Sequence, residues 1–147
     1  MRFELMYESF FKILKGVPLT LEVVFISTLL GFGLAIIVAL MRISDNKLYS
    51  VPAYSFIYLI RGTPLLLQLY FVYYGISQFS FVRESFLWPI LREPFWCGII
   101  TLTISTGAYS AEIIRGGIQS VSQGYIESGK ALGLGRISLF FRIVMPI

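Results

Sequence analysis

The sequence predicts an all-α protein, a polytopic transmembrane helix bundle. Its 147 residues are 56% hydrophobic and only 14% charged, whereas a soluble domain is about 25% charged. The mean hydropathy is +0.79, and the apolar residues gather in long runs that charged residues delimit. Because such runs match the apolar core of a bilayer, lipid is the expected surrounding of most of the chain.

The composition also excludes several kinds of site. There is one cysteine, Cys97, and no histidine, so an internal disulfide, a histidine zinc site and a Ser/His or Cys/His catalytic pair are ruled out. We therefore expect no catalytic residue, no metal and no cofactor in this chain. The net charge of +4 comes from basic residues that stand singly at the ends of apolar runs. That pattern orients membrane segments and does not indicate nucleic acid binding.

Residues 19–41 form the first predicted span. At ~1.5 Å per residue this stretch covers about 34 Å, enough for a hydrocarbon core of about 30 Å. A signal peptide is the alternative, but its apolar region is shorter and ends in a small-residue cleavage site, whereas this stretch ends at Arg42. Small residues recur along it at helical spacing: Thr28, Gly31, Ala35 and Ala39. Such a stripe lets membrane helices approach closely, so we expect a partner helix against it.

The second predicted span covers residues 64–82. Thr63 can cap a helix whose first residue is Pro64, where the missing N–H is not needed. Three residues fall roughly on one face: Gln68, Gly75 and Gln78. Buried amides need a partner or a wet cavity, so this face looks either into a pore or at a neighbouring helix. The aromatic residues 48–60, interrupted by Pro52, predict a short interfacial segment before it.

The third predicted span covers residues 95–114, after a loop that charges and prolines indicate. Small and polar residues lie within one arc of this helix: Gly98, Thr101, Ser105, Ala108 and Glu112. The stripe indicates either tight packing or a pore-lining face. Glu112 and Arg115 are three residues apart, so we expect them to neutralise each other at the membrane boundary.

The two ends of the chain differ in charge pattern. Residues 115–147 are amphipathic and basic, which places them in the cytoplasm. The loop after the first span is also positive, and three spans then put the N-terminus outside, although basic residues near the N-terminus oppose this orientation. Residues 1–18 space their apolar side chains along one face and predict an N-terminal helix in the membrane interface.

Residues 126–146 carry the most specific pattern. They resemble the cytoplasmic EAA loop of importer permeases of the ATP-binding-cassette (ABC) class, with four residues at the required spacings: Glu127, Gly133, Ile143 and Pro146. Ser128 and Gly129 replace the two alanines of that motif, and Met145 replaces a leucine. We expect Glu127 in the first turn of a short helix, where the backbone dipole favours a carboxylate, and Gly133 as a left-handed helix end. Gly129 in place of alanine weakens helix propensity by roughly 1 kcal/mol.

By resemblance, this coupling helix docks into a cleft of an ATP-binding subunit, and five residues form the contact: Glu127, Ser128, Gly129, Lys130 and Gly133. The same stretch reads G-x-x-x-x-G-K from Gly124 to Lys130, close to a phosphate-binding loop. That loop needs Ser or Thr after the lysine and a buried strand before it, and Ala131 follows here. ATP with magnesium is therefore expected on a partner subunit.

Two further stretches, residues 56–75 and 108–121, resemble permeases of the polar amino acid uptake group, which includes histidine, glutamine, arginine and cystine systems. The resemblance implies a type I importer fold in the bacterial inner membrane. It also implies an ATP-binding subunit dimer, a second permease subunit in a homo- or heterodimer, and a periplasmic or surface solute-binding protein. Permeases of this group usually have five spans. We therefore expect residues 19–147 to be one incomplete transmembrane domain, from a partial sequence or a frameshifted remnant.

The expected function is that of a permease subunit, which is not an enzyme. Four polar residues of the spans are the candidates for the substrate pathway: Gln68, Thr101, Ser105 and Glu112. The alternative is a non-transporting membrane scaffold or a non-functional permease fragment, in which the same residues only pack helices. The spacing of the EAA-like motif favours transport, because a scaffold needs no cytoplasmic docking helix.

Overall fold

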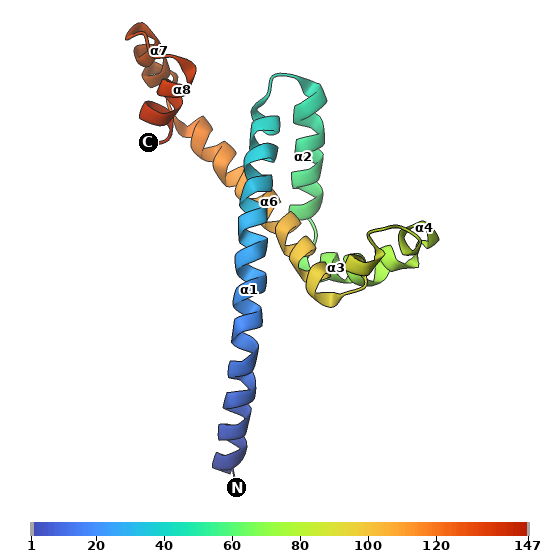
Figure 1. Cartoon of the computed structure of the whole chain (residues 1–147). Helices are drawn as coiled ribbons and strands as arrows, with labels where there is room; N and C mark the ends of the chain where they lie inside the picture. The colour runs from blue at the N-terminus through green and yellow to red at the C-terminus, as the bar shows by residue number, and fades with distance from the viewer. Residues whose placement is uncertain (1, 147) are drawn as a thin grey trace.

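The computed structural model describes residues 2–146, and every element in that range is helical. Three helices form the bundle: α1 (Arg2–Ile43), α2 (Lys47–Arg61) and α6 (Pro94–Ser120) (Figure 1). Shorter elements complete the chain: α3 (Leu65–Tyr70), a π-helix (Phe71–Gly75), a 3-10 turn (Ile76–Gln78), α4 (Ser80–Arg83), α5 (Trp88–Leu91), α7 (Gln123–Ala131), α8 (Arg136–Leu139) and a second π-helix (Phe140–Val144). The predicted all-α class is confirmed.

The small-residue stripe of α1 packs against α6, as expected for a helix with a partner. A Cβ added to Gly31 would lie 2.7 Å from Thr106 Cβ, and one added to Gly107 would lie 2.7 Å from Leu34 Cδ2. Each helix therefore supplies a glycine that lets the other approach. Ala35 and Ala39 are fully buried, whereas Thr28 is exposed and Ser27 is buried instead.

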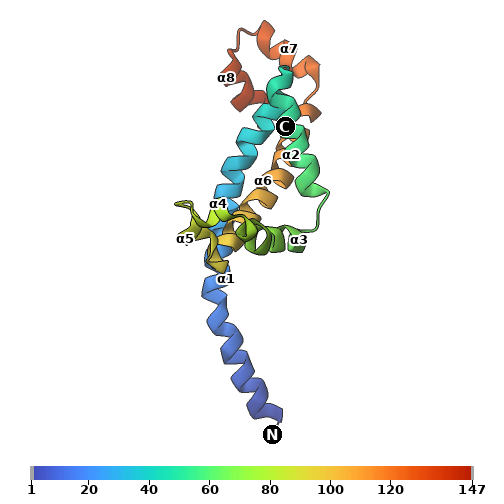
Figure 2. The ribbon, with the colours of Figure 1, turned by 90° about the vertical axis from the view of Figure 1, so that its right-hand side faces the viewer.

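The N-terminal region differs from the expected separate helix. α1 runs without a break from Arg2 through Pro18 to Ile43, and its N-terminal part extends away from the other helices (Figures 1 and 2). Thr20 Oγ1 donates a hydrogen bond to the Gly16 carbonyl beside this proline. The described residues of this segment, from Arg2 on, are helical, and they continue into the first span. Its position in the interface stays a prediction.

The second span is built differently from the single helix expected at residues 64–82. α2 is a regular helix of 15 residues despite Pro52, and Asn46 Oδ1 caps it by accepting from Leu48 N at 2.9 Å. The helical segment from Leu65 to Gln78 follows α2 with a bend of 104°, and the chain is extended at Phe79. Within the described residues, two helices are long and apolar enough to cross a membrane, or three spans if the bent pair counts as one.

Packing explains why α2 forms where a broken segment was predicted. Its Ala53 and Ile57 are buried against Ala35, Val38 and Ala39 of α1. These contacts and the Asn46 cap outweigh the loss of one backbone hydrogen bond at Pro52. The predicted capping role of Thr63 is wrong, because Pro64 is the cap of α3 and makes no side-chain hydrogen bond. Thr63 Oγ1 instead donates to the Leu59 carbonyl at 3.0 Å, at the C-terminal end of α2.

α6 begins one residue before the predicted third span and continues six residues past its predicted end at Ile114. It therefore reaches from α5 to the segment that carries α7 and α8. These two helices and the α1–α2 connection lie toward the same end of the molecule, opposite the N-terminus (Figures 1 and 2).

Candidate functional site

The first candidate site is the terminal knob, which we define as α7 with the returning residues 132–144. Gly133 has a φ of 78°, which confirms the predicted left-handed helix end. Its N–H donates to the Lys130 carbonyl at 2.9 Å, and the N–H of Leu134 donates to the Gly129 carbonyl at 3.1 Å. This pair of bonds is a Schellman motif, which satisfies the last carbonyls of α7.

Glu127 is not in the first turn of α7, contrary to the prediction. The helix begins at Gln123 after the cap residue Ser122, so Glu127 is its fifth residue and gains little from the helix dipole. The motif spacing located the end of the helix correctly but not its beginning. Four of the five predicted contact residues are exposed: Glu127, Ser128, Lys130 and Gly133.

Gly129, the fifth predicted contact residue, is buried. A Cβ at this position would lie 2.5 Å from Ile143 Cδ1 and 3.4 Å from Leu139 Cδ1. The glycine therefore lets the returning segment pack onto α7, which offsets its weak helix propensity. This role was not visible in the sequence, because the contacts join Gly129 to residues ten and fourteen positions away.

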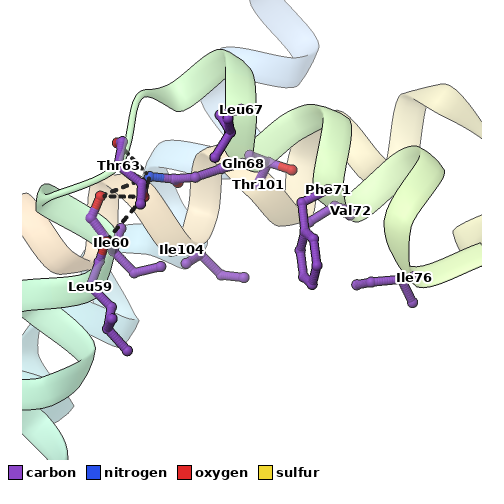
Figure 3. A pocket seen from close by; sticks show the side chains of 10 residues that line it. All are labelled: Leu59, Ile60, Thr63, Leu67, Gln68, Phe71, Val72, Ile76, Thr101 and Ile104. Atoms are coloured by element: carbon purple, nitrogen blue, oxygen red, sulfur yellow. Dashed lines mark hydrogen bonds between the residues drawn. The ribbon is translucent and has the colours of Figure 1, made fainter.

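The second candidate site is the bend between α2 and α3. Gln68 Nε2 donates to the Ile60 carbonyl at 2.7 Å, to the Thr63 carbonyl at 3.0 Å and to Thr63 Oγ1 at 2.9 Å (Figure 3). Gln68 Oε1 is buried and has no hydrogen-bond partner among the described residues. The amide thus fastens the end of α2 to the first turns of the next helix.

A cavity of about 330 Å³ lies between this bend and α6. Gln68 and Thr101 both line it, together with apolar side chains that include Phe71 and Ile104 (Figure 3). Thr101 is 2% exposed, and its hydroxyl donates to the Cys97 carbonyl at 2.7 Å. The cavity is therefore almost wholly apolar. Ser105 is half-buried on the same helix and lines neither this cavity nor the one described next.

The third candidate site is a cavity of about 340 Å³ that contains Glu112. We call it the arginine cavity and define it by its lining residues: Arg42 of α1, Tyr54, Ile57, Tyr58 and Arg61 of α2, Gly62, and Tyr109 and Glu112 of α6. Gln68 and Thr101 therefore share one cavity, whereas Glu112 belongs to another. The four predicted pathway residues do not form a single site.

The charges of the arginine cavity are arranged around tyrosine rings. The guanidinium carbon of Arg42 lies 5.0 Å from the centre of the Tyr54 ring, and that of Arg61 lies 5.4 Å from the centre of the Tyr109 ring. Arg115 Nε donates to Glu112 Oε1 at 3.0 Å, which confirms the predicted ion pair. Among the described residues, no cluster of three or more His, Cys, Asp or Glu side chains is placed to hold a metal ion.

The sequence reasoning missed Arg42 and Arg61, because both were treated as loop charges that orient the membrane spans. A usable signal was present, since Tyr54, Tyr58 and Arg61 recur at spacings of four and three residues and so share one face of α2. Recognising it required residues 47–61 to be read as one helix.

Comparisons with known proteins place this chain among transport permeases. A family described as "Binding-protein-dependent transport system inner membrane component" matches residues 31–147. The nopaline transport system permease protein of Agrobacterium fabrum is 51% identical over 148 residues, covering 100% of this chain and 61% of that protein. The octopine transport system permease protein of Rhizobium radiobacter is 49% identical over 141 residues, covering 96% and 58%. The histidine/lysine/arginine/ornithine transport system permease protein of Escherichia coli is 36% identical over 132 residues, covering 89% and 56%.

Among solved structures, the crystal structure of an amino acid ABC transporter with histidines matches with a TM-score of 0.72 and 33% sequence identity, covering 93% of this chain and 63% of that one. The chain thus spans about three-fifths of the length of the proteins it matches. The family match begins at Gly31 within α1 and includes α2, α6, both cavities and the terminal knob. This chain therefore belongs to the family of binding-protein-dependent transport system inner membrane components.

Proposed function

We propose that this chain forms part of the membrane pathway of an ABC importer for polar amino acids and couples that pathway to a separate ATPase. The terminal knob carries the proposal. Its helix α7 exposes Glu127, Ser128 and Lys130 to solvent. A Schellman motif ends this helix, and the returning segment packs against its buried side at Gly129. An isolated helix of 9 residues is marginal in water, so this bracing suits an element that must keep its shape while a partner pushes on it.

The connection between the knob and the membrane helices is short. Only Val121 and Ser122 separate α6 from α7, and Val121 is buried. α6 in turn contacts α1 closely at Gly31 and Gly107. Movement of α7 is therefore passed to a tightly packed helix pair, which is the kind of rigid element that can carry coupling between sites.

The partners follow from this arrangement. An ATP-binding subunit dimer takes the knob on the cytoplasmic side and holds ATP with magnesium. A second permease subunit, identical or related, completes the pathway, and a periplasmic or surface solute-binding protein delivers the substrate. The chain itself is a multi-pass protein of the bacterial inner membrane. The names of its relatives support opines and basic amino acids as the substrate class.

The two cavities receive different roles in this proposal. Gln68 and Thr101 use their donor groups within the protein, so they shape the bend and the packing and do not bind a polar ligand through these groups. Glu112 lies in the arginine cavity with charged and aromatic neighbours, so it remains the candidate for substrate contact. Ser105, on the same helix as Glu112, remains a candidate for a residue that lines the pathway.

Co-purification tests the proposed coupling. In detergent, we expect the wild-type chain to retain its cognate ATP-binding subunit and Glu127→Arg to lose it while staying membrane-inserted. Glu84→Arg makes the same charge reversal at an exposed position outside the knob and is expected to retain the ATPase. If the wild type retains no ATP-binding subunit, or if both variants behave alike, the coupling role is wrong.

A further inference from the structure

The segment that connects α2 to α6 carries a group of exposed aromatic side chains. They include Tyr70, Tyr74, Phe79, Phe81, Phe86 and Trp96. Phe86 is 87% exposed and Phe81 is 71% exposed, so no other part of the described chain covers these rings. We call residues 70–96 the aromatic collar. Apolar surface of this kind usually marks contact with a membrane or with another protein.

The collar also carries charges, and these restrict what can surround it. Its charged residues are all exposed: Arg83, Glu84, Arg92 and Glu93. The hydrocarbon core of a bilayer disfavours ionised side chains, whereas bulk water disfavours exposed apolar rings. The interfacial layer between them, which contains the phospholipid headgroups, accepts both kinds of side chain and is where aromatic belts of membrane proteins lie.

The height of the collar in the fold agrees with this layer. The segment from Leu65 to Gln78 is bent by 104° from α2, so it runs nearly perpendicular to that helix. Both views place α3, α4 and α5 across the direction of α1, on the side away from the terminal knob (Figures 1 and 2). α2 has 15 residues and rises about 21 Å at ~1.5 Å per residue, less than the ~30 Å of a hydrocarbon core. The chain therefore turns along the membrane before it has passed far beyond it.

The charges of the collar are partly satisfied within the chain. Arg83 Nε donates to the Ser77 carbonyl at 2.6 Å, and this bond holds α4 across the extended backbone at Phe79. Arg92 Nε lies 3.7 Å from Glu93 Oε1 in an ion pair. The two arginines and two glutamates of the collar also sum to zero charge. The aromatic rings are therefore the part of the collar that its surroundings must cover.

We propose that the aromatic collar anchors the end of the bundle opposite the terminal knob in the interfacial layer of the bilayer. Zwitterionic phospholipid is the matching surface, because a collar without net charge attracts neither an anionic nor a cationic partner. Anchoring there sets the height at which α6 enters the membrane, since α6 begins at Pro94 within the collar. This inference goes beyond the proposed coupling role and concerns a different part of the chain.

Tryptophan fluorescence tests this placement, because the two tryptophans of the chain, Trp88 and Trp96, both lie in the collar. The chain is reconstituted into phosphatidylcholine vesicles whose acyl chains carry bromine either close to the headgroup or close to the terminal methyl group. Bromine quenches only nearby indole rings, and both leaflets carry it, so the orientation of the chain does not matter. We expect shallow bromine to remove most of the emission and deep bromine to remove little.

Single-tryptophan variants calibrate the depth. Trp88→Phe and Trp96→Phe remove the native signal, and a new tryptophan is then placed at one exposed position at a time. Phe86→Trp reports on the collar, and we expect shallow bromine to quench it. Leu30→Trp lies near the middle of the first predicted span and should be quenched by deep bromine. Tyr125→Trp on α7 should be quenched by neither.

A charge placed in the collar tests whether the rings do the anchoring. In Phe86→Asp, we expect the emission of Trp88 to shift to longer wavelength and to lose its shallow quenching. Leu48→Asp makes a comparable change at a residue of α2 that is 74% exposed and lies outside the collar, and it should leave Trp88 unchanged. Phe86→Leu keeps an apolar side chain and should also leave Trp88 unchanged, which separates lost anchoring from a general loss of structure at this position.

Three results would overturn this inference. Stronger quenching of Trp88 by deep bromine than by shallow bromine would place the collar in the hydrocarbon core. Quenching by aqueous iodide but by neither bromine would place it in water. Protection from iodide that appears only when the solute-binding protein is added would assign the collar to that protein. The co-purification test is independent, because it reads the terminal knob.

Discussion

At the scale of single residues, glycines decide how closely the elements of this chain can meet. Gly31 and Gly107 allow α1 and α6 to touch, and Gly129 allows the returning segment to lie on α7. Gly133 serves a different need, because its φ of 78° is strained for any residue with a side chain. Three of these four glycines act through contacts, and only the last acts through the backbone.

Gly31→Val is expected to destabilise the chain by about 1–3 kcal/mol, the usual range for overpacking a close contact. The new Cβ would lie 2.7 Å from Thr106 Cβ and 3.2 Å from the Thr103 carbonyl oxygen, and the backbone atom cannot rotate away. Thermal denaturation in detergent measures the effect. Gly33→Val is the matched control, since nothing lies within 4 Å of a Cβ there. Equal melting temperatures for both variants would show that the α1–α6 contact is not tight.

At the scale of elements, one side chain holds the bend that redirects the chain from α2 into α3. Gln68 makes all three of its hydrogen bonds to residues on the other side of the turn. The hydrogen bonds of Gln68 therefore stabilise the bend of 104°, and Pro64 alone does not account for this bend.

Gln68→Leu should loosen this bend, because the replaced amide leaves the Thr63 hydroxyl and the Ile60 carbonyl with fewer partners, a loss of about 1–3 kcal/mol. Hydrogen exchange measures it: amides of residues 60–68 are expected to exchange faster than in the wild type. Gln78→Leu is the control, since Gln78 is exposed and makes a single bond of 3.4 Å to Tyr74. Unchanged protection in Gln68→Leu would mean that the bend does not depend on the amide.

At the scale of the whole molecule, the sequence was informative where local patterns decide the outcome. Long apolar runs located α1 and α6, the helical spacing of small residues predicted a partner helix against α1, and one glycine located the end of α7. The Glu112–Arg115 pair followed from spacing on one helix.

Features that depend on residues far apart in the chain could not be read in this way. Pro52 suggested a break, but burial of Ala53 and Ile57 against α1 stabilises α2 as a helix. The bend needs an amide that reaches back across a turn, and the arginine cavity gathers residues from three helices. The substrate-pathway residues stay a prediction: they came from two predicted spans, and the structure places Gln68 and Thr101 at one cavity and Glu112 at another.

Site-directed cross-linking tests most directly whether the terminal knob is the surface that meets the ATPase. Ser128→Cys puts a thiol on the exposed face of α7, and Ser80→Cys puts one on α4, in a different part of the molecule (Figures 1 and 2). The native Cys97 is buried and should not react. With a bismaleimide in assembled membranes, the Ser128→Cys chain is expected to cross-link to the ATP-binding subunit and the Ser80→Cys chain is not. Cross-linking through position 80 but not position 128 would contradict the account.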